Sequence, residues 1–399
     1  MTPMPPSLEL TGAIPKQLHA LLAGMRERHE VTVITVAGPD PGELAAADRL
    51  REDGIDAHVV RRLSGGVLGN WRRRSRIVWG WTALRLPWRP LWCYGADAQG
   101  LIDRLTAGNA FDLVAVEDNA MAVYRYPAGL PSVLTEHEVR RPRPARWPRP
   151  GSRGWPSRML AEIDWARWPR YQARVWARFD LVQTFTARDA ASVVEMAPVL
   201  RGRTRVIPFG IDVPPACDPG LQEPGSLLFA GSMTHYPNVD AALWLARDVL
   251  PRIRSRNPGA RLVIAGPHPP PEVQALAGEH VEVTGWVSEL RPVMERAEVV
   301  LAPVRTGGGM RMKVLEAMAL GKAVVTTPRG AEGLQVGDHA PPLQVAEDPQ
   351  GIAEATLALL DDRGARESMA RAARAFVEEH HGSRAYAIRL DAIYREAAG

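Results

Sequence analysis

Three consecutive glycines, followed by charged side chains at helical spacing, form the part of this sequence that carries the most chemistry. Gly307–Gly309 precede a helical pattern that contains Arg311, Lys313 and Glu316. Glycines before a helix let backbone N–H groups approach an anion closely, and the helix dipole and two cations add positive potential at the same end. Glu316 follows one to two turns into the helix, where its carboxylate can accept hydrogen bonds from a ribose diol. The pattern predicts a nucleotide-diphosphate site.

Strand and helix patterns alternate on both sides of this motif. The apolar runs that predict strands are Leu227–Ala230, RLVIAG (261–266), VEVTG (281–285), EVVLAP (298–303) and AVVTT (323–327). Helices are expected over Val239–Ile253, over Leu290–Arg296, and through most of the chain after Pro349. Such alternation is typical of a parallel, doubly wound α/β sheet, which binds its ligand at the carboxyl ends of the strands.

The first half repeats the alternation less regularly. Its strand candidates are HEVTVITV (29–36), IDAHVV (55–60), FDLVAV (111–116), SVLTE (132–136) and FDLVQTF (179–185), with helices expected over Pro15–Arg28 and Glu43–Asp53. The proline- and glycine-rich segment 207–225 is the expected domain boundary. The segment TPMPPSLELTG (2–12) resembles a loop that follows a strand, yet no strand precedes it. Because the first strand of such a sheet is central, we expect the natural chain to begin upstream and this sequence to lack that strand.

Length and composition limit the class of protein. A chain of 399 residues is too long for one ordinary core, so two domains are expected. No apolar run is long enough to predict a transmembrane helix, and the N-terminus has no secretory pattern. The two cysteines, Cys93 and Cys217, lie too far apart in sequence to indicate a disulfide framework or a metal cluster. We therefore expect a cytoplasmic protein.

Two segments of the first half are rich in arginine and tryptophan. Arg61–Gly95 contain eight arginines, five tryptophans and no acidic residue, and Arg140–Arg178 contain eleven arginines and five tryptophans. Indole rings and cations suit an anionic membrane surface, so a peripheral position on the inner face of the membrane is expected. Two alternatives remain: a solvated basic surface over buried tryptophans, and a nucleic-acid surface, which we do not expect.

Residues Gly225–Gly399 resemble family 4 of the retaining glycosyltransferases, which belong to glycosyltransferase group 1. The matching phrases are FAGSMTHYPN (229–238), LVIAGP (262–267), VTGWV (283–287) and, most specifically, VVLAPVRTGGGMRMKVLEAMALGKAVVTTPRGAEG (299–333). The resemblance implies the GT-B fold, in which two Rossmann-like doubly wound domains face each other across the donor site. It implies an acceptor-binding domain over 1–210, a nucleotide-sugar-binding domain over 211–380, and a terminal helix over 381–399 that crosses back to the first domain.

The sequence departs from the usual motif of that family at two places. Many members carry two glutamates separated by seven residues. Glu316 matches the second, but Gly308 stands at the first position, as in a subgroup with a Gly-Gly-Gly-x-Arg-x-Lys-x-x-Glu run. The usual pair of phosphate-binding cations after the first strand of the second domain is also missing. Arg311 and Lys313 are therefore expected to supply that charge.

The resemblance implies specific roles for individual residues. His137, Arg311 and Lys313 are expected to act in catalysis, with His137 contacting the donor sugar or the acceptor. The donor is expected to contact Gly12, Ser232, Trp286, Val287, Gly307, Gly308, Gly309, Met310 and Glu316. The structural alternatives are a solvated Glu316 paired with Lys313, a structural His137 and a core position for Trp286.

The implied activity is transfer of a hexose from a nucleotide diphosphate sugar to a glycan or lipid-linked acceptor, in cell-envelope or exopolysaccharide synthesis. No Asp-x-Asp pair or His/Cys cluster offers a metal site, so neither a metal nor another cofactor is expected. The leaving diphosphate would then be stabilised by backbone amides, arginine and lysine. Two other functions stay open: a catalytically impaired scaffold subunit, and a nucleotide-sugar epimerase that would use His137, Glu136 and Glu138.

Overall fold

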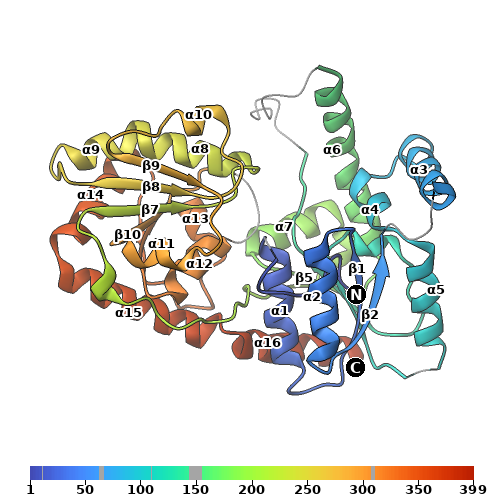
Figure 1. The fold of residues 1–399 in the computed structure, drawn as a ribbon. Coiled ribbons are helices and arrows are strands. Elements are labelled where there is room, and N and C mark those ends of the chain that lie inside the picture. Colours follow the sequence, from blue (N-terminus) through green and yellow to red (C-terminus); the bar gives the residue numbers. More distant parts are fainter. Residues whose placement is uncertain (11, 63–66, 109, 143–154, 307–310) are drawn as a thin grey trace. The chain divides into compact units, whose positions relative to one another are not determined.

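The computed structural model describes residues 1–10, 12–62, 67–108, 110–142, 155–306 and 311–399. The chain forms two compact units. One comprises Met1–Gly210 together with Ser383–Gly399, and the other comprises Ile211–Gly382. Each unit has parallel strands with helices packed on both sides (Figure 1). The predicted doubly wound α/β architecture is therefore confirmed.

The second unit is built on a six-stranded sheet in the order β12-β11-β10-β7-β8-β9. Its strands are β7 (Ser226–Ala230), β8 (Arg261–Ala265), β9 (Val281–Gly285), β10 (Val299–Ala302), β11 (Ala323–Thr326) and β12 (Gln344–Val345). All of the pairings are parallel. Every residue of β7, β10 and β11 is buried, because helices cover both faces of these central strands. This explains why the strands appear in the sequence as continuous apolar runs.

Helices precede, connect and follow these strands. They are η4 (Pro219–Leu221), α8 (Tyr236–Trp244), η5 (Leu245–Val249), α9 (Leu250–Arg254), α10 (Pro271–Gln274), α11 (Arg291–Arg296), α12 (Met312–Ala319), α13 (Pro328–Ala331), α14 (Pro349–Asp361) and α15 (Arg363–His380). The helix expected over Val239–Ile253 is interrupted by the π-turn η5. Pro251 has no N–H to donate to the preceding turn, which favours a local change of helical hydrogen bonding.

The first unit contains two parallel sheets. One pairs β1 (Thr32–Ala37) with β2 (Asp56–Arg61), and the other has the order β3 (Val114–Glu117), β4 (Ser132–Glu136), β5 (Leu181–Thr184), β6 (Thr204–Val206). The first two residues of the chain lie between them. The N-terminal amine of Met1 donates to the carbonyl of Ala115 at 2.8 Å, and the N–H of Thr2 donates to the carbonyl of Ile34 at 2.9 Å. The expectation of an upstream start stays a prediction.

Helices cover the sheets of the first unit. They are α1 (Ala13–Met25), α2 (Pro41–Glu52), α3 (Val67–Thr82), α4 (Trp88–Cys93), α5 (Ala96–Leu105), η1 (Thr106–Gly108), η2 (Met121–Val123), α6 (Trp155–Trp176), α7 (Ala187–Met196), η3 (Pro198–Leu200) and α16 (Ser383–Ala398). A core of aliphatic and aromatic side chains, including Trp168 and Trp176, lies under β3 to β5.

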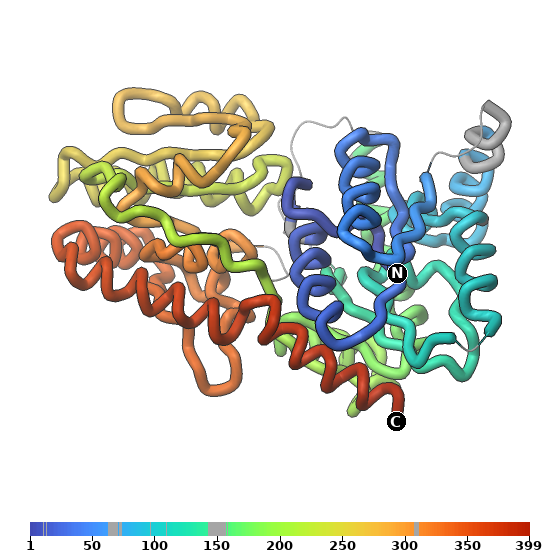
Figure 2. The backbone as a smooth tube through the Cα atoms, turned by 60° about the horizontal axis from the view of Figure 1, so that its bottom comes forward, coloured from blue at the N-terminus to red at the C-terminus, as the bar shows by residue number. Residues whose placement is uncertain are grey.

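The C-terminal helix α16 packs against α1 (Figure 2). The two helices approach so closely at Gly24 that a Cβ there would lie 2.4 Å from the Cβ of Ala387. Tyr386 is fully buried, and its hydroxyl accepts a hydrogen bond from the Gln17 amide at 2.8 Å. The last helix of the chain therefore forms part of the core of the first unit.

Candidate functional site

Closely packed glycines mark the carboxyl ends of β7, β8 and β9 in the second unit. The N–H of Gly231 donates to the carbonyl of Ala265, and the N–H of Gly266 donates to that of Gly285, both at 2.9 Å. Gly266 has a φ of 147°, and a Cβ on it would lie 2.0 Å from the carbonyl oxygen of Gly231. Only glycine fits there, so the loops after these strands are held close together at the edge where such sheets bind ligands.

Lys313, in the first turn of α12, reaches the end of β7. Its ammonium donates to Asn238 Oδ1 at 2.5 Å and lies 4.4 Å from the centre of the Phe229 ring. A Cβ at Gly231 would lie 2.6 Å from this Nζ, so the absence of a side chain at Gly231 makes room for the lysine. This contact could not be predicted from local sequence, because Asn238 and Lys313 are 75 positions apart.

The environment of Lys313 changes its protonation. The pKa of Lys313 is lowered from its usual value of 10.5 to about 7, mainly by burial and in smaller part by Arg311, while Glu316 opposes this shift. An arriving diphosphate would reverse the effect by supplying negative charge beside the amine. Arg311 and Glu316 thus both act electrostatically on Lys313, and binding of an anion by these residues stays a prediction.

Three other expected donor contacts lie in the same unit. The hydroxyl of Ser232 is hydrogen-bonded to that of Thr234 at 2.8 Å, and its carbonyl accepts from the Asn238 amide at 2.7 Å. Trp286 follows β9 and is 66% exposed, so it is not a core side chain. Val287 beside it is half-buried. Their contacts with a nucleobase stay predictions.

Gly307, Gly308, Gly309 and Met310 lie outside the described residues. The strand end that precedes them is fixed by Arg305, which makes two hydrogen bonds of 3.0 and 2.6 Å to the carboxylate of Asp240 and lies 4.8 Å from the centre of the Trp244 ring. Asp240 and Arg305 were not expected from the sequence, because their pairing depends on how α8 packs beside β10.

In the first unit, His137 follows β4 and meets a carboxylate at the end of β3. Its Nε2 lies 3.1 Å from Glu117 Oε2, and both side chains are almost fully buried, at 6% and 2% exposure. The hydroxyl of Thr135 also lies 2.9 Å from Glu117 Oε1 and donates there. Sequence reasoning missed Glu117. Because β3 and β4 are neighbouring parallel strands, with Glu117 opposite Thr135, their last residues lie at the same edge of the sheet.

Two more carboxylates, those of Glu136 and Asp118, lie near the carboxyl ends of β3 and β4. Burial raises the pKa of Glu136 to about 7, with a further contribution from Asp118. The two oxygens of Glu136 accept hydrogen bonds from Asn119 and from the Trp176 indole, each at 2.6 Å. Asp118 pairs with Arg89 of α4 at 2.7 Å and has the unusual φ of 76°.

Gly12 is the N-cap of α1, with a φ of 110° and an exposed position. No side chain caps this helix through a hydrogen bond. A residue with a side chain would be strained at that φ, so the glycine has a structural reason as well as the expected role at the donor.

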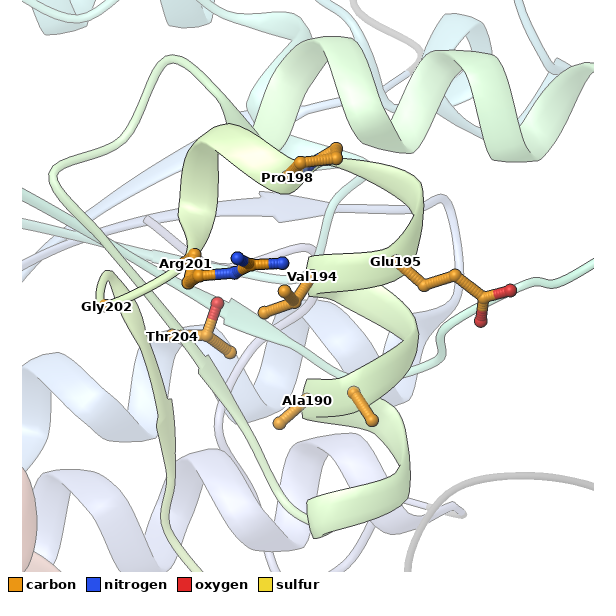
Figure 3. A pocket seen from close by; sticks show the side chains of 8 residues that line it. Ala190, Val194, Glu195, Pro198, Arg201, Gly202 and Thr204 are labelled. Atoms are coloured by element: carbon orange, nitrogen blue, oxygen red, sulfur yellow. The ribbon is translucent and has the colours of Figure 1, made fainter.

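A surface groove of about 610 Å³ lies between α7 and the start of β6 in the first unit (Figure 3). Its lining includes Val194, Arg201 and Thr204. Thr204 is the first residue of β6, so the groove lies at the amino edge of the parallel sheet, whereas His137 follows the carboxyl edge. None of the predicted site residues lines it.

The described residues contain no group of three or more His, Cys, Asp or Glu side chains that could hold a metal ion. None of the helices placed by the structure has both the length and the apolar character that crossing a membrane requires. Independence from metals stays a prediction.

Residues 224–362 match a family model described as glycosyl transferases group 1. The phosphatidyl-myo-inositol mannosyltransferase of Mycolicibacterium smegmatis is 30% identical over 167 residues, which cover 39% of this chain and 42% of that protein. The glycogen synthase of Mycobacterium tuberculosis is 31% identical over 160 residues, which cover 38% of this chain and 37% of that protein. The chain thus spans about two fifths of the length of these curated relatives.

Solved structures resemble the whole chain. HepE of Anabaena, crystallised in complex with UDP and glucose, has a TM-score of 0.64 at 13% identity, and the match covers 99% of both chains. Sucrose-phosphate synthase of Thermosynechococcus elongatus has a TM-score of 0.64 at 15% identity, over 99% of this chain and 97% of that one. These neighbours confirm the predicted GT-B fold, while the expected subgroup stays a prediction. Residues 224–362 thus resemble the group 1 glycosyl transferases, and the chain has the fold of these solved structures.

Proposed function

We propose that the protein is a retaining glycosyltransferase that moves a hexose from a nucleotide diphosphate sugar to a glycan or lipid-linked acceptor. The acceptor would belong to cell-envelope or exopolysaccharide synthesis. The donor would bind the second unit, and the reaction would take place in the cytoplasm, at the inner face of the membrane. Two observations support the donor class: the match to glycosyl transferases group 1 over residues 224–362, and the UDP-sugar complexes of HepE, which has the same fold.

The placement of Lys313 carries this proposal. Its amine lies at the carboxyl end of β7, beside Gly231, and at the N-terminal end of α12. From the family resemblance, we expect the donor phosphates to bind at this carboxyl end of β7. Positive charge that is already in position, within a partly buried site, stabilises a leaving diphosphate more strongly than the same charge in water.

Charge on the leaving group would be met by protein groups rather than by a metal. Arg311, Lys313 and the backbone N–H groups at the start of α12 would take this role. We propose a front-face displacement in which the departing phosphate accepts the proton of the acceptor hydroxyl. Such a route needs no carboxylate nucleophile, and the carboxylates beside His137 are engaged by other groups: Glu136 by Asn119 and Trp176, and Asp118 by Arg89.

The same observations disfavour an epimerase. Its acid and base would have to come from His137, Glu136 and Glu138. Both oxygens of Glu136 already accept hydrogen bonds, and Glu138 is an exposed residue paired with Arg140 at 2.9 Å.

Nucleotide binding is the test of the proposal. Thermal unfolding would be followed with UDP, GDP, ADP, dTDP and their sugars, in the presence of a chelator. A ligand that binds only the folded state raises the midpoint of unfolding, and a tighter ligand raises it more at the same concentration. We expect one nucleotide to stabilise the protein and the Glu316→Ala variant to lose that stabilisation. The control is Glu379→Ala, which removes an exposed carboxylate from α15.

The sugar nucleotide identified in this way would then be supplied with candidate acceptors, and the anomeric configuration of the product would be read by NMR. An inverted product would contradict retention. If no nucleotide stabilises the protein, the scaffold function becomes the better explanation.

A further inference from the structure

Large apolar side chains remain exposed on neighbouring helices of the first unit. Trp71 and Trp79 of α3 are 69% and 57% exposed, and Trp88 and Trp92 of α4 are 46% and 40% exposed. By contrast, Trp168 of α6 is 1% exposed. Water-facing indoles in such number are uncommon, and exposed apolar patches of this kind usually mark an interaction site.

One carboxylate joins a third helix to this surface. Asp164 of α6 accepts a hydrogen bond from the Trp81 indole at 3.3 Å, near the end of α3, and another from the backbone N–H of Trp88 at 2.7 Å, at the start of α4. Leu160 and Ile163 precede Asp164 by one turn and by one residue, and are 52% and 36% exposed. These exposed aliphatic residues therefore lie within about one turn of the carboxylate that contacts α3 and α4, helices that Figure 1 shows with α6 in the first unit.

The same surface is basic. The segment Arg61–Gly95 has eight arginines and no acidic residue, and Arg74 and Arg85 within it are exposed. Each cation close to an anionic bilayer strengthens binding by about fivefold. We use the name Trp–Arg surface for Trp71, Arg74, Trp79, Arg85, Trp88, Trp92, Leu160 and Ile163.

The exposed aliphatic residues favour an anionic bilayer over a nucleic acid as the partner of this surface. A nucleic acid contacts cations through phosphate and stacks its bases on indoles, but it has no apolar phase for Leu160 or Ile163. The interfacial region of a bilayer accepts all three kinds of side chain, because indoles lie at headgroup level and aliphatic groups reach the acyl boundary.

We propose that the Trp–Arg surface docks the protein on an anionic lipid bilayer. The short helix α4 also carries Arg89, which pairs with Asp118 directly after β3. The docking helix is thus joined by an ion pair to the strand ends that hold His137. Delivery of a lipid-linked acceptor from the bilayer to these strand ends rests on the proposed function; docking itself does not.

Vesicle flotation of the full chain tests the surface. Vesicles of phosphatidylcholine alone would be compared with vesicles that also contain phosphatidylglycerol. We expect binding to the second kind only, weakened roughly tenfold or more when Trp71, Trp79 and Trp92 are replaced by serine. The matched control is Trp286→Ser, which removes an equally exposed indole from the second unit.

Substitution of the arginines gives a second test that does not depend on the tryptophan substitutions. Replacing Arg74 and Arg85 by glutamine should weaken binding about 25-fold, whereas replacing Arg363 and Arg371 of α15, whose side chains are each 72% exposed, should not. Added salt should weaken wild-type binding in the same direction.

Three results would overturn the proposal: no flotation with phosphatidylglycerol vesicles, flotation of the triple tryptophan variant equal to wild type, or binding of an oligonucleotide through these residues without vesicle binding. Nucleotide stabilisation, measured on the same samples, separates the two proposals. Vesicle binding without nucleotide stabilisation would leave docking in place and contradict the transferase function. Nucleotide stabilisation without vesicle binding would contradict docking and the proposed position at the membrane, and would leave the transferase activity in place.

Discussion

The charge of Lys313 should depend on whether a diphosphate is bound. Its pKa is lowered to about 7 in the free protein, so a large fraction of the amine is neutral above that pH. A bound diphosphate would raise this pKa, and binding above pH 7 would therefore take up a proton. The dissociation constant of the nucleotide should rise as the pH increases from about 7 to 9, by at most tenfold per pH unit. Below pH 7 it should become independent of pH. Isothermal titration calorimetry in buffers of different ionisation enthalpy would measure the proton uptake.

The variant Lys313→Met supplies the comparison for this pH dependence. It should bind the nucleotide about tenfold to a hundredfold more weakly at pH 7 and should show no further loss up to pH 9. Arg371→Met on the exposed side of α15 should behave as wild type. A pH profile that persists in Lys313→Met would show that another group is responsible.

Glu117 orients His137 from the neighbouring strand. Replacing Glu117 by glutamine keeps the shape but removes the charge that Nε2 meets at 3.1 Å. We expect kcat to fall by about tenfold to a hundredfold with little change in donor affinity, because imidazole orientation matters most in the reacting complex. Steady-state kinetics of Glu117→Gln, His137→Ala and the double variant would measure this. If the two losses simply multiply in the double variant, the residues act independently and the positioning role is wrong.

Single residues also show how far the sequence alone can go. The run that contains Lys313 and Glu316 could be recognised because glycines, cations and a carboxylate follow one another within one loop and helix. Asn238 and Glu117 could not be recognised in this way. Each meets its partner only through packing and strand register, over separations of 75 and 20 positions.

At the scale of elements, the second sheet depends on the close approach of the loops after β7 and β8. Gly266→Ala would place a Cβ 2.0 Å from the carbonyl oxygen of Gly231 at a φ of 147°. We expect a loss of about 3 kcal/mol or more in the free energy of unfolding of this unit, because backbone must move to make room. Urea denaturation followed by circular dichroism would measure the loss.

A matched glycine lies in the same unit. A Cβ at Gly278 would meet nothing within 4 Å, and Gly278→Ala should change the free energy of unfolding by less than about 1 kcal/mol. Equal effects of the two substitutions would mean that the contact at Gly231 does not restrict the backbone.

Elements of the second unit were easier to predict than those of the first. The run 281–285 coincides with β9, and Leu227–Ala230 differs from β7 by one residue. The strand β7 is easy to recognise because a buried parallel strand is a nearly continuous apolar run. The interruption at η5 was missed, since periodicity shows a helical face but not a change in hydrogen bonding. Helices α3 and α4 were also not expected, because arginine and tryptophan alternate there without an apolar stripe.

At the scale of the whole molecule, the division into units predicts what can fold alone. Lys313, Glu316 and Trp286 all belong to Ile211–Gly382, which has a hydrophobic core of its own. A fragment of these residues should unfold cooperatively and retain stabilisation by the nucleotide that the full chain prefers, with weaker affinity. Differential scanning calorimetry with and without that nucleotide would measure both properties.

A fragment of Met1–Gly210 serves as the comparison. It lacks α16, and with it the buried side chains of Tyr386, Leu390 and Ile393, so it should aggregate or melt at lower temperature than the same fragment in complex with an α16 peptide. A cooperative, soluble Met1–Gly210 would show that α16 is dispensable for this core.

The uneven distribution of tryptophan has a spectroscopic consequence. Ten of the twelve indoles belong to the first unit, and Ile211–Gly382 contain only Trp244 and Trp286. Trp244 is 7% exposed and Trp286 is 66% exposed, so their emission should differ in wavelength and in accessibility to a quencher in water. Intrinsic fluorescence of the second unit would therefore report selectively on the loop after β9, and a nucleobase that covers Trp286 would be seen without any added label.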